Sequence, residues 1–312
     1  MSAFFPKKAV ACAGPESIYF FDTVTSDITQ KNSEQFFAKI FKNTPLWGLL
    51  MRNVFRSLQA VISLLVVVTA LPVMAGEVSV AVAANFTAPL KEIVTRFERE
   101  SGHKVVASFG ATGQFYAQIR NGSPFDMLLA ADESVPTKLE QEGNAVPGTR
   151  FTYAIGRLVL WSAKTGLVDD RGAVLSVGEF GHLAIANPIT APYGLAAVQT
   201  LKALGEYERI APKFVQGANI TQTFQFIQTG NAPLGFVAMS QVFENGKLQS
   251  GSVWIVPTKL YAPIRQQAVV LSKGRSNPVA LAFFSYLKGK AARDVMQYYG
   301  YDFEQGGNGP SP

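Results

Sequence analysis

Two long strand-like runs interrupt a regular alternation of strands and helices, and they constrain the fold more than any other feature of this sequence. They are "RFTYAIGRLVLWSAK" (Arg150–Lys164) and "IRQQAVVLSK" (Ile264–Lys273). Single strands in globular proteins are usually shorter than the first of these runs. Each run is long enough to cross from one folded part to another, so the pair predicts a chain that leaves a first lobe and later returns to it.

Strand and helix patterns alternate in the stretch before the first crossing. "EVSVAVAA" (77–84), "KVVASFG" (104–110) and "FDMLLAA" (125–131) predict strands, and amphipathic stretches between them predict helices. This order favours a parallel sheet with helices on both faces. A second set of strand and helix patterns lies between the two runs.

The predicted fold class is therefore α/β, a clamp of two lobes joined by two crossing strands. We expect one domain over residues 76–304. Lobe one would comprise about 77–155 and 265–304, and lobe two about 156–264. A polar tail, residues 305–312, would follow.

A leader precedes the predicted domain. Residues 51–75, "MRNVFRSLQAVISLLVVVTALPVMA", have a basic start, an apolar centre and small residues at the end. This order is typical of a cleavable signal peptide, although a single membrane anchor or a buried helix is the alternative. Residues 1–50 would then be an upstream extension outside the mature protein. The only cysteine, Cys12, lies in that extension, and a cysteine-free chain behind a signal peptide suits the periplasm.

The charge of the predicted mature chain argues against nucleic acid as a partner. Of the 28 Lys and Arg and 22 Asp and Glu residues, seven and four respectively lie within the first 75 residues. The remainder therefore carries a net charge of only +3, which is too mild for a nucleic-acid surface.

Four loops combine a strand end, small or hydroxyl residues and a helix start. They contain Ala84-Asn85, Ala111-Thr112-Gly113, Pro192-Tyr193-Gly194 and Asn219-Ile220-Thr221. Ligands of open α/β sheets lie beyond the carboxyl ends of the strands, so in a clamp these loops would face one cleft. Helix N-termini attract anions through their free N–H groups. The four loops contain no Lys or Arg, so the anion would be held by neutral donors.

Motifs of catalysis are absent from the sequence. No phosphate-binding G-x-x-x-x-G-K-[ST], no H-E-x-x-H and no G-x-S-x-G pattern occurs. His103 and His182 fall in predicted turns, and Asp126 and Asp132 flank a strand as cap or turn residues would. We therefore expect neither an enzyme nor a cofactor. An enzyme acting on an anionic substrate would need an acid–base pair in the cleft.

Donors without acceptors favour a fully ionised anion. A protonated anion would bring an O–H group that finds no acceptor in such a site. A buried dianion also needs several charge-assisted bonds to replace its hydration. The loops therefore predict capture of a doubly charged tetrahedral oxyanion.

The chain from about Glu77 to Tyr301 resembles the periplasmic molybdate-binding proteins of ABC importers. The segments that carry the resemblance are "VAVAANFTAPLKEIVTRFERESGHKV", "GATGQFYAQIRNGSPFDMLLAADE", "RFTYAIGRLVLWS", "ANPITAPYGLAAVQTLKALG" and "NAPLGFVAMSQV". The resemblance implies the two-lobed type II periplasmic-binding fold. It also implies binding of molybdate and tungstate, with molybdenum present only as the bound oxyanion, and delivery to a membrane permease by a monomer. Sulfate and phosphate are the alternative ligands.

The resemblance also places the ligand contacts. They fall at Ala84 or Asn85 and at Thr112 in lobe one, and at Tyr193 and Ile220 in lobe two, the last through its backbone N–H. Many members of the family have a tyrosine after the strand "LGFV", where this chain has Ala238. Tyr193 is the candidate to replace that ring.

Overall fold

The structure is a computed structural model, and it describes Val54, residues 75–177 and residues 179–304. The described residues from Ala75 to Glu304 belong to one compact unit. The predicted extension (1–50), almost all of the predicted signal peptide (51–75) and the tail (305–312) lie outside the described residues. Within the part that is described, no helix combines the length and the apolar character needed to span a bilayer.

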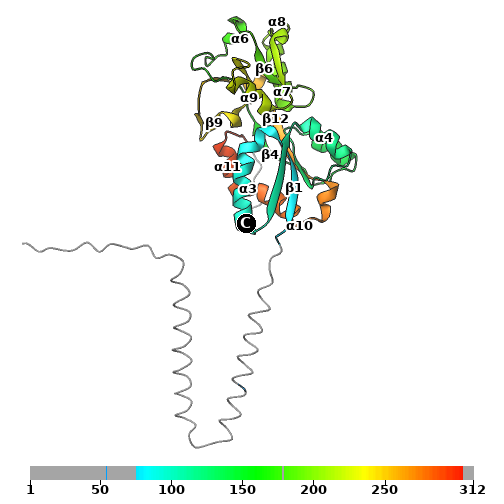
Figure 1. Ribbon diagram of the computed structural model, residues 1–312. Coiled ribbons are helices and arrows are strands. Elements are labelled where there is room, and N and C mark those ends of the chain that lie inside the picture. The colour runs from blue at the N-terminus through cyan, green and yellow to red at the C-terminus, as the bar shows by residue number, and fades with distance from the viewer. Residues whose placement is uncertain (1–53, 55–74, 178, 305–312) are drawn as a thin grey trace, which may run out of the picture. The chain divides into compact units, whose positions relative to one another are not determined.

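Lobe one is built on a five-stranded sheet in the order β2-β1-β3-β12-β4 (Figure 1). The strands are β1 (Glu77–Ala83), β2 (Lys104–Gly110), β3 (Met127–Leu129), β4 (Phe151–Gly156) and β12 (Ile264–Val270). β1 pairs in parallel with β2 and β3, as the sequence predicts, whereas β12 is antiparallel to both β3 and β4. The sheet is therefore mixed, because β12 runs opposite to both of its neighbours.

Helices cover both faces of this sheet. They are α3 (Thr87–Ser101), α4 (Thr112–Arg120), α5 (Ser134–Gln141), α10 (Pro278–Leu287) and α11 (Lys290–Tyr298), with the short turns η1 (Ala84–Phe86) and η5 (Ser272–Ser276). Alternate residues of β1 serve the two faces. Val80 and Val82 pack with Phe283 of α10, while Ala81 packs on the other face with Phe115 of α4. Gly102 ends α3 in the left-handed conformation (φ 71°), which glycine adopts without strain.

Lobe two has a second five-stranded sheet in the order β11-β5-β8-β6-β7. Its strands are β5 (Leu158–Ser162), β6 (Leu183–Ala186), β7 (Phe214–Gly217), β8 (Leu234–Ala238) and β11 (Ser252–Ile255). The helices are α6 (Val174–Val177), α7 (Pro192–Ala203), α8 (Tyr207–Ile210) and α9 (Ile220–Gln228). Short elements complete the lobe: η2 (Ala211–Lys213), η3 (Met239–Gln241), η4 (Thr258–Leu260) and the pair β9 (Phe243–Glu244) and β10 (Lys247–Leu248).

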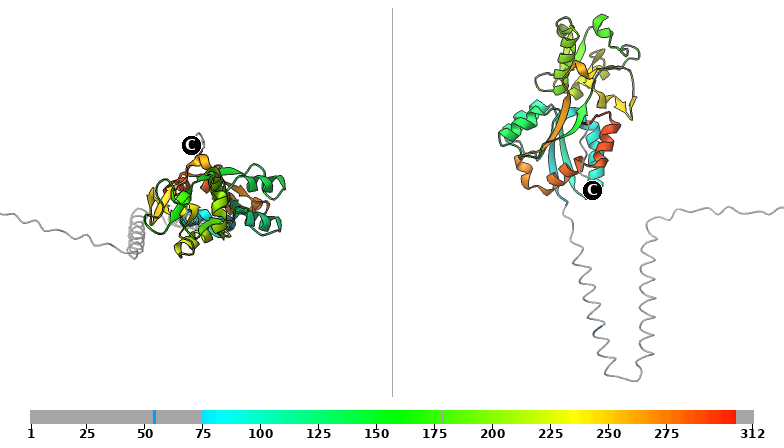
Figure 2. Two further views of the ribbon diagram at one scale, coloured as in Figure 1. Left: turned by 90° about the horizontal axis from the view of Figure 1, so that it is seen from above. Right: turned by 180° about the vertical axis from the view of Figure 1, so that it is seen from behind.

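The chain crosses between the sheets at two places. The first long run divides at Arg157 into β4 of lobe one and β5 of lobe two. The second run was expected to cross, but β12 pairs along its length with strands of lobe one, and the crossing is the segment 256–263 that precedes it. Seen from behind, the green β4–β5 segment and the orange β12 run side by side between the lobes (Figure 2).

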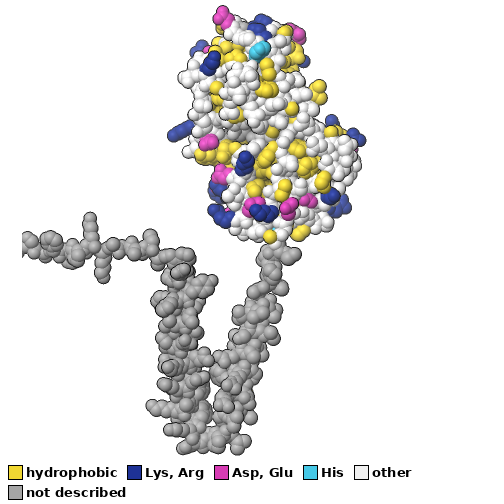
Figure 3. All heavy atoms as spheres, in the orientation of Figure 1, with side chains coloured by type: hydrophobic (Ala, Val, Ile, Leu, Met, Phe, Trp, Pro, Cys, Tyr) yellow, Lys and Arg dark blue, Asp and Glu magenta, His cyan; other side chains and the backbone are white. Residues whose placement is uncertain are grey.

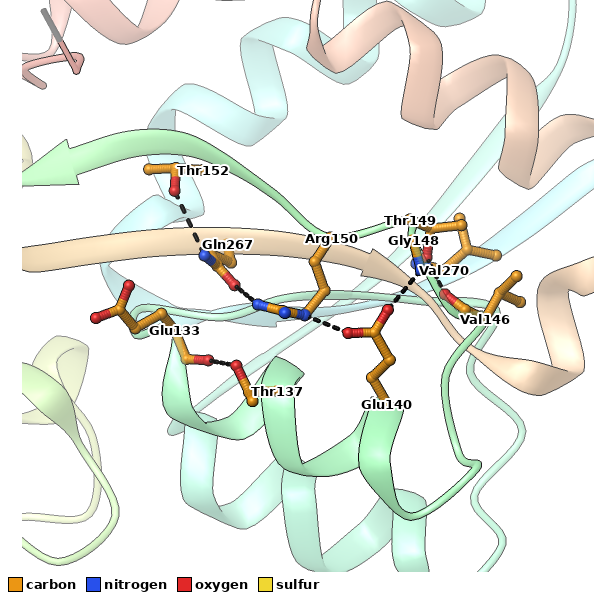
Figure 4. A network of polar contacts seen from close by, with 10 residues as sticks. All are labelled: Glu133, Thr137, Glu140, Val146, Gly148, Thr149, Arg150, Thr152, Gln267 and Val270. Atoms are coloured by element: carbon orange, nitrogen blue, oxygen red, sulfur yellow. Dashed lines mark hydrogen bonds and ion pairs between the residues drawn. The ribbon is translucent and has the colours of Figure 1, made fainter. Parts of the chain in front are cut away.

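A polar network anchors the crossing strands within lobe one (Figure 4). Arg150, just before β4, donates to Glu140 of α5 at 2.5 Å and to Gln267 of β12 at 3.1 Å. Gln267 in turn donates to Thr152 of β4. These contacts tie β4, β12 and α5 together within lobe one.

Candidate functional site

The four predicted loops meet at one place because each follows the carboxyl end of a strand. β1 leads to Ala84 and Asn85, and its parallel neighbour β2 leads to Thr112. In lobe two, β6 leads to the loop before Tyr193, and its parallel neighbour β7 leads to Ile220. Parallel pairing puts both carboxyl ends at the same edge of each sheet, and the two edges face each other.

A small cavity lies between these edges. Its lining residues come from both lobes: Ala83, Ala84, Asn85, Gly110, Ala111, Thr112, Ala131, Ala191, Pro192, Tyr193, Asn219 and Ile220. All five predicted ligand contacts are among them. None of these described lining residues has a charged side chain.

The hydroxyl of Thr112 is arranged as a donor. Ala111, not Thr112, is the N-cap of α4, so Thr112 does not cap its own helix. Its oxygen instead accepts from the backbone N–H of Ala131 at 3.0 Å. Among the described residues the Thr112 proton has no acceptor, and the side chain is 1% exposed. The hydroxyl can therefore donate a hydrogen bond to an anion in the cavity.

The N-terminus of α9 supplies a backbone donor. The Asn219 carboxamide oxygen accepts from the N–H groups of Thr221 and Gln222, both at 3.0 Å. The first N–H groups of a helix have no partner within it, so this cap leaves the N–H of Ile220 for another acceptor. The ligand contact predicted for this N–H of Ile220 stays a prediction.

The side chain of Asn85 does not serve the cavity as a donor. The amide nitrogen donates to Gln266 and to the Tyr301 hydroxyl, both at 2.9 Å. The backbone carbonyl of Asn85 accepts from Ser240 at 2.9 Å and from Tyr301 at 3.0 Å. What the Ala84-Asn85 turn can offer an anion is its backbone N–H groups.

The phenol of Tyr193 reaches the crossing strands. Its oxygen accepts from the side chain of Gln266 at 3.2 Å, beside Gly156 at the end of β4. Burial raises the pKa of Tyr193 well above its ordinary value, and the neighbouring Tyr301 raises it further. Burial likewise raises the pKa of Tyr301 to about 12. Both phenols therefore keep their protons at neutral pH and add no negative charge near the cavity.

Several hydrogen bonds join the lobes around the cavity. The N–H of Gly113 donates to the carbonyl of Thr190 at 2.9 Å. On the other rim, Thr221 donates to the carbonyl of Ala84 at 3.2 Å, and Ser240 donates to that of Asn85 at 2.9 Å. The structure thus shows the two lobes closed on each other.

The sequence analysis missed the buried polar residues behind the cavity. Tyr153, Ser240, Gln266 and Tyr301 form one hydrogen-bonded group with Asn85 and Tyr193. The available signal was the pair of glutamines, Gln266 and Gln267, in the middle of a predicted strand. Ala238, where many relatives have a tyrosine, is fully buried at the end of β8 and does not line the cavity.

The site offers no cluster of metal ligands. Among the described residues, no group of three or more His, Cys, Asp or Glu side chains is placed to hold a metal ion. The cavity instead combines O–H and N–H donors from both lobes, an arrangement that can surround a small anion.

Comparison with other proteins agrees with this geometry. The family described as bacterial extracellular solute-binding protein matches residues 78–302. The molybdate-binding protein ModA of Azotobacter vinelandii is 60% identical over 230 residues, which cover 74% of this chain and 91% of that protein. The ModA of Rhodobacter capsulatus is 52% identical over 237 residues, covering 76% and 92%. A solved structure of the Azotobacter vinelandii periplasmic molybdate-binding protein superposes with a TM-score of 0.71 at 42% identity, covering 73% of this chain and all of that one.

Proposed function

This chain belongs to the family of bacterial extracellular solute-binding proteins, and from that premise we propose that it captures molybdate outside the cytoplasm for an ABC importer. It acts as a transport binding protein and not as an enzyme. The relatives at 52% and 60% identity are molybdate-binding proteins, and they cover nearly the whole described domain.

One observation carries the proposal: a small cavity closed between two lobes and lined by donors without a charged side chain. Neutral donors can replace the hydration of a dianion when several point at it together. Helix N-termini add partial positive charge without a cation that would also attract other anions. Ala84 or Asn85, Thr112, Tyr193 and Ile220 are the proposed contacts, with backbone N–H groups from both lobes and the hydroxyl of Thr112.

Tungstate is proposed as a second ligand, because it has the same charge and shape as molybdate. The protein is proposed to work as a monomer that delivers its anion to a membrane permease. We also propose that residues 51–75 are removed as a signal peptide on export to the periplasm, with residues 1–50 outside the mature protein.

Titration calorimetry of the chain from Gly76 tests the function. Molybdate and tungstate should bind one per chain, each more tightly than sulfate or phosphate by at least about tenfold, or about 1.4 kcal/mol. Tighter binding of sulfate or phosphate would assign the site to another oxyanion. Absence of binding by all four anions would refute the assignment of this cavity to oxyanions.

A further inference from the structure

Gln266 lies on β12 directly behind the cavity. Its side chain is fully buried, and the pairing of β12 with β4 shifts register between Gln266 and Gln267. Burying an amide costs free energy unless its polar atoms find partners. A glutamine in this position therefore needs a set of hydrogen bonds to explain it.

Three side chains satisfy Gln266. Its carbonyl oxygen accepts from the Asn85 amide and from the Tyr153 hydroxyl, both at 2.9 Å. Its amide nitrogen donates to the Tyr193 hydroxyl at 3.2 Å. Each polar atom of the Gln266 side chain is thereby engaged.

Two of these partners belong to the loops that line the cavity, one in each lobe. Asn85 lies in the turn after β1, and Tyr193 lies in the first turn of α7. The chain Asn85–Gln266–Tyr193 therefore connects a donor loop of lobe one to a donor loop of lobe two through a single side chain.

The connection is tightly enclosed. A β-carbon on Gly156 would lie 2.1 Å from the Tyr193 hydroxyl and 2.7 Å from the Gln266 amide nitrogen. The backbone of β4 thus approaches the contact so closely that a β-carbon on residue 156 would displace Tyr193 or Gln266. The geometry holds Tyr193 and Gln266 together at the crossing between the lobes.

We propose that Gln266 is a positioning residue that sets the spacing between the two donor loops in the closed state and so selects the size of the anion. This inference rests on the proposed function. Sulfate has shorter bonds to oxygen than molybdate, so the same donors would have to approach more closely to surround it. A rigid spacer behind the cavity prevents that approach, and a loosened one permits it.

The test compares Gln266→Met with Gln267→Met by titration calorimetry, using molybdate and sulfate. Methionine keeps the length of the side chain and removes its hydrogen bonds. Gln267 is the matched control, because it lies on the same strand and contacts Arg150 and Thr152 rather than the cavity (Figure 4). Gln266→Met should lose about tenfold in molybdate affinity and narrow the preference for molybdate over sulfate. Gln267→Met should leave both unchanged.

Gln266→Asn keeps an amide but draws it back from the Tyr193 hydroxyl, and it keeps the test decisive where Gln266→Met folds poorly. Tyr193→Phe, at a residue that is itself a proposed ligand contact, is compared with the Gln266 variants. It removes only the phenol oxygen, so it should reproduce the loss in affinity and in preference. The double variant should then lose no more than either single variant, since both break the same connection.

The outcomes separate the two proposals. A Gln266→Met protein that melts earlier but keeps the molybdate-to-sulfate ratio has lost a structural contact only, which overturns the inference. The inference is also overturned if Tyr193→Phe loses molybdate affinity and Gln266→Met does not. The phenol of Tyr193 would then act on the anion directly. A parent protein that binds molybdate while both variants match it overturns this inference alone. A parent that binds no oxyanion overturns the proposed function as well.

Discussion

Thr112 shows how one hydroxyl can be held ready to donate. Its oxygen accepts from the N–H of Ala131, and its proton has no acceptor among the described residues. A ligand oxygen in the cavity can supply that acceptor. The hydroxyl therefore contributes affinity for an oxyanion.

Thr112→Val should weaken molybdate binding and also lower stability. The lost bond to a charged ligand is worth about 1.5–3 kcal/mol, or roughly ten- to hundredfold in affinity, and the unpaired Ala131 N–H costs about 1–3 kcal/mol of folding free energy. Calorimetric affinity and thermal melting of the ligand-free protein measure the two effects. Thr112→Ser keeps the hydroxyl and should retain affinity. A valine variant that binds as tightly as the parent would exclude Thr112 from the site.

Asp132, next to the lining residue Ala131, bears on the pH dependence of stability. Burial raises the pKa of its carboxyl, while bonds from Val135 and Ser134 and the charge of Lys138 lower it in part. The folded state therefore holds the proton more tightly than the unfolded state. Stability falls as pH rises from about 4, the ordinary pKa of aspartate, through the raised pKa.

Asp132→Asn removes this charge and keeps an oxygen that can accept from Val135. We expect the variant to melt at a higher temperature than the parent at pH 7. The difference should shrink at low pH, where the parent carboxyl is protonated. Asp170→Asn, at an exposed carboxylate, is the control and should change little. An Asp132→Asn protein that melts at or below the parent temperature at pH 7 would contradict the expectation.

At the scale of single residues, the sequence predicted which residues line the cavity and not how their side chains are used. Thr112, Tyr193 and Ile220 could be placed because each starts a helix after a strand. The engagement of the Asn85 amide by Gln266 and Tyr301 could not be predicted. It joins residues 181 and 216 positions apart, and no local pattern encodes such contacts.

At the scale of elements, the start of α4 meets the loop before α7 across the lobes. Gly113 allows this contact, because a β-carbon there would lie 2.9 Å from the Cα of Thr190. The backbone bond from Gly113 to Thr190 forms only at that close approach. Closure of the lobes thus depends on a residue without a side chain at the first turn of a helix.

Gly113→Ala should therefore weaken molybdate binding by about tenfold or more, equivalent to about 1.4 kcal/mol, because the added methyl group meets backbone that cannot move aside. The ligand-free protein should melt no earlier than the parent, since alanine favours the helix over glycine by up to about 1 kcal/mol. Gly181→Ala, where a β-carbon meets nothing within 4 Å, should bind as the parent does. Parent-like affinity in Gly113→Ala would mean that the lobes need not approach this closely.

The sequence also predicted most elements of the first half of the chain, because strand and helix periods alternate clearly there. The strands that complete the two sheets were harder to predict from the sequence. Arg157 divides one apolar run into strands of two different sheets, and β12 enters its sheet antiparallel between β3 and β4. These placements depend on pairing with distant strands, which the periodicity of a single segment does not report.

At the scale of the whole molecule, the charged side chains lie on the surface and the cavity is lined by uncharged residues. On the face shown in Figure 3, Lys and Arg side chains are scattered over both lobes, with Asp and Glu side chains among them. The described residues around the cavity carry no charged side chain. Recognition of the anion therefore depends on the closed arrangement of the two lobes rather than on a positive surface.

Small-angle scattering should show this arrangement forming. Because the donors are divided between lobes, an anion is fully surrounded only when the lobes meet, so molybdate should reduce the radius of gyration of the protein. Gly113→Ala at the same molybdate concentration should compact less. An unchanged profile of the parent at saturating molybdate would show that binding does not require closure.

The position of β12 also determines the order in which the molecule can be completed during synthesis. The strands of lobe two all lie between Leu158 and Ile255, so that sheet can assemble from one continuous stretch as the chain leaves the ribosome. Lobe one cannot, because its sheet lacks a strand between β3 and β4 until residues 264–270 have been made, and its core lacks α10 and α11 until later still. The same late strand carries Gln266 into place behind the cavity. The site is thus among the last parts of the protein to be assembled, and a chain that stops short of β12 lacks both the strand that completes the sheet of lobe one and the Gln266 contact with Tyr193.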